Sequence, residues 1–391
     1  MLRRGGLWLF VSACLLTGAY FGAYRLGLWD RVQARFFPRK LRLSSGDFPA
    51  GVAAPIGDLA SLPLRPVRVG FVPRGSSAAL LLAAGGATFP GAAEDPAAPP
   101  PEGLFRTRYA LDGRAVAFGR EEELLSALKM GGDEGGVDLA AMSVDRLAEW
   151  AAGLRDAAPR AILLLGRSRG QEALASVSAR SLSELRGKKI AVARHTPCEY
   201  FALWLTARAG LAVSDVSWVE VPAVADAGKA LRDGRADAAV GFAGDLELAL
   251  RERGGAMLAS SADAPHLLAT VLVARGEFAA RYPDAIRRLS RALLDAAGAV
   301  GKGSTEAARR LGEVAPYLGD PSDAIHFAPP ASLEDNLAFF GLAGEPPVTF
   351  DELFASAGAL FVKLGRVQEV PAPEEVRDLA VLRWVNANKP P

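Results

Sequence analysis

The stretch VDLAAMSVDRL at residues 137–147 has a counterpart in GRADAAVGFAGDL at residues 234–246. Each stretch reads as an apolar strand that ends in the first turn of a helix. The order strand, helix, strand, helix, strand, helix runs through residues 67–150 and is repeated through residues 188–250. Two copies of one α/β unit predict two similar lobes, and the crevice between lobes is where small ligands usually bind.

Strands that alternate with helices predict a mostly parallel sheet, flanked by helices, in each lobe. We expect lobe 1 to comprise residues 67–166 and 264–391, and lobe 2 to comprise residues 167–263. Residues 266–274 read as a strand that returns to lobe 1. The remainder of the chain shows apolar spacing of three and four, which predicts helices at residues 277–301, 304–316, 332–340, 350–364 and 373–388.

The composition is that of a folded protein with room for two domains, because half of the 391 residues are apolar. A net charge of +1 supplies no basic field, so nucleic acid is not an expected partner. The three histidines lack the spacing of metal ligands, and the chain has no Gly-rich phosphate loop with a lysine. We therefore expect neither a metal nor a cofactor.

Residues 1–40 are interpreted as a transmembrane anchor with a basic flank, and residues 41–66 as a Pro/Gly-rich tether. Residues 5–24 carry no charge, and twenty helical residues cover a hydrocarbon core of roughly 30 Å. Two alternatives stay open. Residues 11–14, VSAC, resemble a lipobox with Cys14 as the lipidated residue, and residues 17–19, TGA, resemble a cleavage site.

The location expected for the chain is the inner membrane, with the body in the periplasm or outside the cell. Basic residues are more numerous after the apolar stretch than before it, which by a simple count favours a cytoplasmic body. Large domains are translocated largely regardless of such counts, so this count does not decide the orientation.

Four strand ends carry the candidate ligand-binding residues, because ligands bind beyond the carboxyl ends of parallel strands, near helix N-termini. Each of these residues has an alternative role as a simple helix cap. The candidates at the strand ends are Arg74 with Ser76, Ser143, Thr196 with Tyr200, and Asp245.

The sharpest local signal is the segment HTPCEY at residues 195–200. Thr196 as N-cap, Pro197 at the first helical position and Glu199 at the third form a capping box. Cys198 would then lie near a helix N-terminus, which lowers a thiol pKa, and His195 is three residues away. An enzyme that uses Cys198 as a nucleophile is therefore one alternative, although no orienting partner is evident.

Several segments resemble the periplasmic substrate-binding proteins of ABC importers, in the branch that binds nitrate, sulfonates, taurine and thiamine precursors. The segments are RVGF at residues 68–71, GVDLA at residues 136–140, SLSELRGKKIAV at residues 181–192 and GRADAAV at residues 234–240. The resemblance implies a type 2 periplasmic-binding-protein fold that closes on a small solute and presents it to a membrane permease. It also implies pocket positions at Ser76, Ser143, Thr196 and Asp245, with Arg169 and Gln171 on the segment between the lobes.

The charges at the helix starts favour one kind of ligand. Asp145, Glu199 and Asp245 each lie within a first helical turn, where they would raise the cost of binding an inorganic dianion. We therefore expect a ligand with a cationic or nitrogen-rich end, such as an amino-sulfonate or a heterocycle, rather than nitrate. The same fold could also serve a sensor or interaction module that reports to a membrane partner without transport.

Overall fold

The computed structural model describes residues 56–90, 102–301, 305–318 and 320–388, all of which belong to one compact unit spanning residues 52–391. The expected membrane anchor at residues 5–24 and the first part of the expected tether lie outside the described residues. Within the described ranges, no helix is both long enough and apolar enough to cross a membrane.

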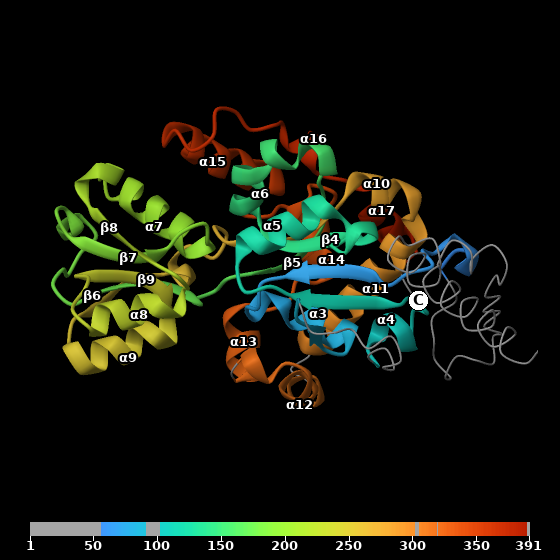
Figure 1. The fold of residues 1–391 in the computed structure, drawn as a ribbon, viewed down its shortest axis with the longest axis horizontal. Helices are drawn as coiled ribbons and strands as arrows, with labels where there is room; N and C mark the ends of the chain where they lie inside the picture. Colours follow the sequence, from blue (N-terminus) through green and yellow to red (C-terminus); the bar gives the residue numbers. More distant parts are fainter. Residues whose placement is uncertain (1–55, 91–101, 302–304, 319, 389–391) are drawn as a thin grey trace, which may run out of the picture. The chain divides into compact units, whose positions relative to one another are not determined.

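The first of two β-sheets has the strand order β2-β3-β1-β4-β11-β5 (Figure 1). Its strands are β1 (Val67–Phe71), β2 (Ala87–Thr88), β3 (Gly113–Ala117), β4 (Leu139–Ser143), β5 (Arg160–Arg167) and β11 (Ala269–Ala274). All of them run parallel except β11, which is antiparallel to both of its neighbours. We call this sheet and its helices the first lobe.

The second sheet has the order β10-β6-β9-β7-β8 and, with its helices, forms the second lobe. Its strands are β6 (Glu172–Ser176), β7 (Lys189–Ala193), β8 (Ser217–Val221), β9 (Ala238–Phe242) and β10 (Ala256–Ser260). Only β6 runs against the other strands. The prediction of an α/β fold built on two mostly parallel sheets is confirmed.

The sequence repeat is also a repeat of topology. The order β3-β1-β4-β11-β5 in the first sheet corresponds to β8-β7-β9-β6-β10 in the second. The reversed strand of each sheet is the one that arrives from the other lobe, so the chain crosses between lobes twice, from β5 to β6 and from β10 to β11. The two crossings lie side by side, because the Ser168 amide donates to the Leu268 carbonyl at 2.9 Å.

The strand order explains which faces the helices cover. In the second lobe the chain moves from β7 to the edge strand β8 and then back past β7 to β9. Right-handed crossovers in opposite directions place their helices on opposite faces, so α7 (Pro197–Arg208) and α8 (Ala225–Arg232) flank the sheet from two sides (Figure 1). In the first lobe, α3 (Ala78–Ala84) and α5 (Glu121–Met130) are arranged in the same way.

The remaining helices depart from the predictions mainly at prolines. The expected helix at residues 277–301 is interrupted at Tyr282, because a residue before proline is disfavoured in helical conformation. The helix expected at residues 373–388 is divided in two, and α13 was not predicted. The helices are α4 (Leu104–Thr107), α6 (Val144–Trp150), α9 (Ala243–Arg253), α10 (Gly276–Arg281), α11 (Pro283–Gly301), α12 (Thr305–Val314), α13 (Pro321–Phe327), α14 (Leu333–Phe339), α15 (Phe350–Lys363), α16 (Pro373–Val376) and α17 (Ala380–Ala387).

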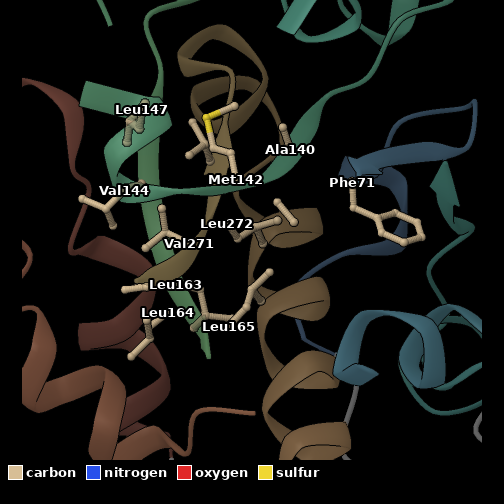
Figure 2. Close-up of a cluster of buried hydrophobic side chains, with 14 of the residues drawn as sticks. Phe71, Ala140, Met142, Val144, Leu147, Leu163, Leu164, Leu165, Val271 and Leu272 are labelled. Carbon is tan, nitrogen blue, oxygen red and sulfur yellow. The ribbon is translucent and has the colours of Figure 1, made fainter. Parts of the chain in front are cut away.

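The core of the first lobe is centred on β11. Figure 2 shows Val271 and Leu272 of this strand among side chains of its neighbours, such as Met142 on β4 and Leu163 on β5. Every residue of β11 is buried. A strand that is covered on both faces has a continuous apolar sequence rather than an alternating one, which is why this strand was recognisable.

Residues 56–66, the last part of the expected tether, contact the first lobe. The Ser61 hydroxyl donates to Asp284 at 2.8 Å, and the Arg65 guanidinium forms two hydrogen bonds of 2.7 Å with Asp138. Asp138 is almost fully buried just before β4. The segment from residue 56 onward is therefore part of the folded body and not of a tether.

A buried amide protects the exposed edge of β5. The Leu164 N–H donates to Asn336 Oδ1 at 2.7 Å, and Asn336 Nδ2 donates back to the Leu164 carbonyl at 3.0 Å. Asn336 lies on α14 and is completely buried. Its side chain thus replaces the neighbouring strand that β5 lacks at this position.

Asn336→Ala should lower the free energy of unfolding by roughly 2–4 kcal/mol, because two buried backbone groups lose their partners. Urea unfolding followed by circular dichroism measures this change. Asn388→Ala is the matched control, since the exposed Asn388 amide donates only to a carbonyl of its own helix, and should change stability by less than about 0.5 kcal/mol. Equal losses in the two variants would contradict the proposed role of Asn336.

Candidate functional site

A small cavity lies where strand ends of the first lobe, both crossing segments and the start of α7 come together. Its volume is about 10 Å³, which is room for roughly one water molecule. Mostly polar side chains line it, and no large apolar side chain fills it. The lining residues are Arg74, Ser76, Ser143, Ser168, Gln171, Glu172, Pro197, Leu268, Thr270 and Ala328.

Four of the eight predicted ligand-binding residues line this cavity: Arg74, Ser76, Ser143 and Gln171. These four residues come from the ends of β1 and β4 and from the first crossing segment, and their role in ligand binding remains a prediction. It did not single out Ser168, Glu172 or Thr270, which the two crossings bring into the same cavity.

The other four predicted residues lie outside the cavity lining. Thr196 uses its hydroxyl in the cap of α7, and Tyr200 is buried against Phe361 of α15, with ring centroids 5.8 Å apart. Arg169 is exposed. Asp245 is the third residue of α9 and not its N-cap, because the helix begins at Ala243.

The two serines from the first lobe differ in their hydrogen bonding. Ser76 accepts a hydrogen bond of 3.0 Å from the Thr270 hydroxyl. Ser143 occupies the N-cap position of α6, as predicted, but its side chain does not cap the helix. Its Oγ is buried and has no hydrogen-bond partner among the described residues. A buried hydroxyl without a partner is costly, so this atom indicates a place for an additional polar group.

Glu172 is the buried acid of the cavity. It begins β6, and the Ser168 hydroxyl hydrogen-bonds to its carboxylate. Ser168 also contacts the Ser261 hydroxyl of the second crossing at 2.7 Å. Burial raises the pKa of the Glu172 carboxyl, although the bond from Ser168 and the positive charge of Arg74 oppose the shift. A neutral Glu172 would be both a donor and an acceptor.

The Arg74 guanidinium is already matched by a carboxylate. It hydrogen-bonds to Glu121 Oε1 at the start of α5, and both side chains are largely buried. The second oxygen, Glu121 Oε2, is buried without a hydrogen-bond partner among the described residues. The charge of Arg74 is therefore already neutralised by Glu121 and does not require an anionic ligand.

A cluster of charged residues lies beside the cavity, between α6 of the first lobe and α7 of the second. Arg146 is completely buried and pairs with Asp145 at 2.8 Å and with Glu149. Glu199, the third residue of α7, pairs with Arg194 at 2.9 Å and with Arg366 at 3.0 Å. We call these six residues the interlobe charge cluster.

The predicted start of α7 is confirmed, with Thr196 as N-cap and Pro197 in the first turn, but the predicted capping box is only half formed. The Glu199 amide donates to Thr196 Oγ1 at 3.4 Å, but the Glu199 carboxylate accepts from the His195 amide instead of the Thr196 amide. His195 adopts a left-handed backbone conformation, with φ of 56°, which turns its N–H toward this carboxylate. Glu199 thus serves as a helix cap and as an ion-pair partner of the first lobe.

Cys198 lacks the surroundings of a nucleophile. Its thiol is 1% exposed, and burial together with the nearby negative charge of Glu172 raises its pKa well above the usual value. An activated cysteine needs the opposite shift and an adjacent base. Among the described residues, no group of three or more His, Cys, Asp or Glu side chains could hold a metal ion.

A larger hollow of about 470 Å³ lies elsewhere on the first lobe, against α5. Arg68, Phe118 and Met130 contribute to its lining. It contains no residue from the crossing segments or from the ends of β1 and β4, so we do not assign the ligand site to it.

Glu172→Gln should raise the melting temperature by a few degrees at pH 8 and change it little at pH 4.5. The folded state favours the protonated carboxyl, so the penalty from this group grows as the pH rises above its unfolded pKa of about 4.3. Glutamine keeps an acceptor for Ser168 and removes the charge. Thermal unfolding at both pH values measures the effect.

Glu352→Gln is the control with the opposite sign. Hydrogen bonds from Thr349 lower the pKa of Glu352, so its charged form contributes stability above its unfolded pKa, and that stability is lost as the pH falls. This variant should melt at a lower temperature than the wild type at pH 8. A lower melting temperature for Glu172→Gln at pH 8 would show that the charged form of Glu172 is favoured.

Residues 170–307 match the model of a protein family described as NMT1/THI5 like. Comparison with curated proteins found no significant match. Among solved structures, the aliphatic sulphonate binding protein SsuA from Escherichia coli is similar, with 17% identity and a TM-score of 0.60 over 81% of this chain and 92% of that one. The nitrate-binding protein NrtA from Synechocystis PCC 6803 is 13% identical, with a TM-score of 0.57 over 83% and 89%.

The desulfurization enzyme DSZB has the same fold, with 13% identity and a TM-score of 0.54 over 83% of this chain and 100% of that one. Most of the similar structures are binding proteins, but the fold alone does not separate binding from catalysis. The predicted resemblance is confirmed: the chain carries an NMT1/THI5-like region and has the type 2 periplasmic-binding-protein fold found in sulfonate- and nitrate-binding proteins of ABC importers.

Proposed function

We propose that this protein is an extracytoplasmic solute-binding protein of an ABC importer, anchored in the inner membrane, and that it is not an enzyme. The observation that carries the proposal is the polar cavity at the strand ends, with the buried Ser143 hydroxyl left without a partner. The family match and the fold support the same function. The raised pKa of Cys198 argues against the alternative of a cysteine-based enzyme.

The ligand is a small organic molecule with a cationic or nitrogen-rich end, such as an amino-sulfonate or a nitrogen heterocycle. Two carboxylate oxygens near the cavity, Glu121 Oε2 and Asp145 Oδ1, are buried without hydrogen-bond partners in the described part of the chain. A ligand that carries N–H or O–H donors would satisfy these two oxygens and the Ser143 hydroxyl. The only guanidinium in the lining, that of Arg74, is already paired.

Two of the three acids expected from the sequence to repel an anion do not do so at this cavity. Glu199 was expected to repel an anion, but Arg194 and Arg366 neutralise it. Asp245 is outside the cavity lining. The preference for a donor-rich ligand rests instead on the unpartnered carboxylate oxygens of Glu121 and Asp145. A plain sulfonate or nitrate has no N–H or O–H group to donate to these oxygens.

Binding requires the lobes to separate. A cavity of about 10 Å³ cannot admit an organic molecule, so the ligand enters an open form and the lobes then close around it. The two crossing segments are the only connections between the sheets in the described part of the chain, and they form the hinge. The permease or another inner-membrane protein is the partner that would receive the closed form. The alternative of a ligand sensor on the same fold differs only in this partner.

A thermal-shift screen of the full-length protein tests the ligand class. Amino-sulfonates and nitrogen heterocycles should raise the melting temperature, while nitrate and sulfate should not, because a ligand that binds only the folded state stabilises it. For a ligand found in this way, Ser143→Ala should weaken binding about tenfold in calorimetry, through loss of one buried hydrogen bond.

Ser126→Ala is the matched control, because the Ser126 hydroxyl is exposed on α5 and bonds only to the carbonyl of Glu122. Its affinity should equal that of the wild type. Tight binding of nitrate or sulfate, unaffected by Glu121→Gln, would overturn the proposed ligand class.

The anchor at residues 5–24 is tested separately, by fractionation of cells that express the full chain. The protein should sediment with the inner membrane, resist carbonate extraction and retain its N-terminus in intact-mass measurement, because an apolar helix of this length stays in the bilayer. A chain without residues 1–40 should be extracted. A mature chain that begins after Ala19, or at a lipidated Cys14, would support one of the two alternatives instead.

A further inference from the structure

The C-terminal end of α15 bridges the two lobes. Arg366 follows a turn at Gly365, whose φ of 67° favours glycine, and its backbone N–H bonds back to the Phe361 carbonyl. This turn returns the chain toward α6, which packs along α15 (Figure 1). The side chain of Arg366 is 15% exposed and extends between the two lobes.

The Arg366 guanidinium binds one carboxylate from each lobe. Its Nε lies 2.9 Å from Glu149 Oε1 of α6 in the first lobe, and its Nη1 lies 3.0 Å from Glu199 Oε2 of α7 in the second. Both carboxylates are 5% exposed, so water screens these pairs weakly. The guanidinium carbons of Arg366 and Arg146 lie 5.5 Å and 4.9 Å from the centre of the Phe361 ring. The same ring also contacts Tyr200 of the second lobe.

The charges of the cluster balance within the chain itself. Three arginines, Arg146, Arg194 and Arg366, face three carboxylates, and His195 Nδ1 lies 3.3 Å from Arg366 Nη2. Opening the lobes would separate Glu199 from Arg366 and from Arg146, whose Nη1 lies 3.9 Å away. Contact between the lobes therefore has its own buried ion pairs and does not need a ligand to supply them.

We propose that Arg366 is a latch that ties Glu149 to Glu199 and holds the ligand-free protein closed. The latch regulates access to the ligand site and so deepens the proposed function. In a clamp without such a contact, closure depends on the greater affinity of the ligand for the closed state. Here the closed state is populated before any ligand binds. A ligand can enter only after the Arg366–Glu199 pair separates, either spontaneously or through contact with a ligand or partner.

Cys198 provides a direct readout of opening. Its thiol is buried at the start of α7, where Arg74 and Asp145 of the first lobe act on it electrostatically. Separation of the lobes would expose it to a small alkylating reagent. Iodoacetamide labelling of the full-length protein at pH 8, without ligand, followed by peptide mass spectrometry, gives the rate at this residue alone.

Arg366→Gln should increase the alkylation rate of Cys198 about tenfold or more, because removal of one partner of a buried ion pair strongly favours its separation. The radius of gyration from small-angle scattering should rise as well. Glu199→Gln, which keeps an acceptor for the His195 amide, should have the same effect. Arg377→Gln is the control, because Arg377 pairs with Asp351 at 2.9 Å within the first lobe, and it should leave both quantities unchanged.

Wild-type labelling rates and radii in both latch variants would overturn the proposal. The melting temperature distinguishes loss of the fold from opening of the lobes. If Arg366→Gln does not fold, Glu199→Gln provides the test of the latch. The measurements contain no ligand, so their result is independent of the ligand screen. If the variants open but the screen finds no ligand, the proposed latch is supported and the proposed solute-binding function is contradicted.

Discussion

A completely buried guanidinium, that of Arg146, sets a constraint on the whole interface between the lobes. A charge in the interior is tolerated only when carboxylates surround it and use its donors. Asp145 and Glu149 on the same helix accept from Nε and Nη1 of Arg146, while its Nη2 has no hydrogen-bond partner among the described residues. Arg366 then balances Glu149 and Glu199. Glu199 belongs to the second lobe. The ion pairs that neutralise the charges of the first lobe therefore also fix the position of the second lobe against it.

The same geometry forms the candidate site. The parallel strands of a lobe end on one side of its sheet, and the two crossings make the reversed strands β6 and β11 begin on that side. Residues far apart in the chain, such as Ser76 and Thr270, therefore bond to each other. The cavity lies next to the charge cluster, so movement of the lobes affects both together. Ligand access and ion pairing are two consequences of one interface.

The fold was largely predictable because its signals are local. Periodicity, turn residues and the repeat gave most strands of both sheets but missed β2, β6 and β10. The Thr196-Pro197 signal gave the start of α7 to the residue. One error has a local cause, because Pro283 divides a helix that apolar spacing alone shows as continuous. Another has a long-range cause, because residues 56–66 are held by Asp284, 223 positions from Ser61, and by Asp138, 73 positions from Arg65. Four of the eight predicted residues, Arg74, Ser76, Ser143 and Gln171, line the cavity, because strand ends are recognisable in a sequence.

The sequence by itself determined the repeat, the α/β class, the family resemblance and the positions of the strand ends that line the cavity. Only the tertiary structure decided which charges face the site. Glu199 and Thr196 have the right position on the helix, yet their groups are used by Arg366 and by the cap. Glu172 lines the cavity instead, and Glu121 pairs with the lining residue Arg74. The reason is that the partner of a buried charge is set by packing between distant segments, and no local pattern records it.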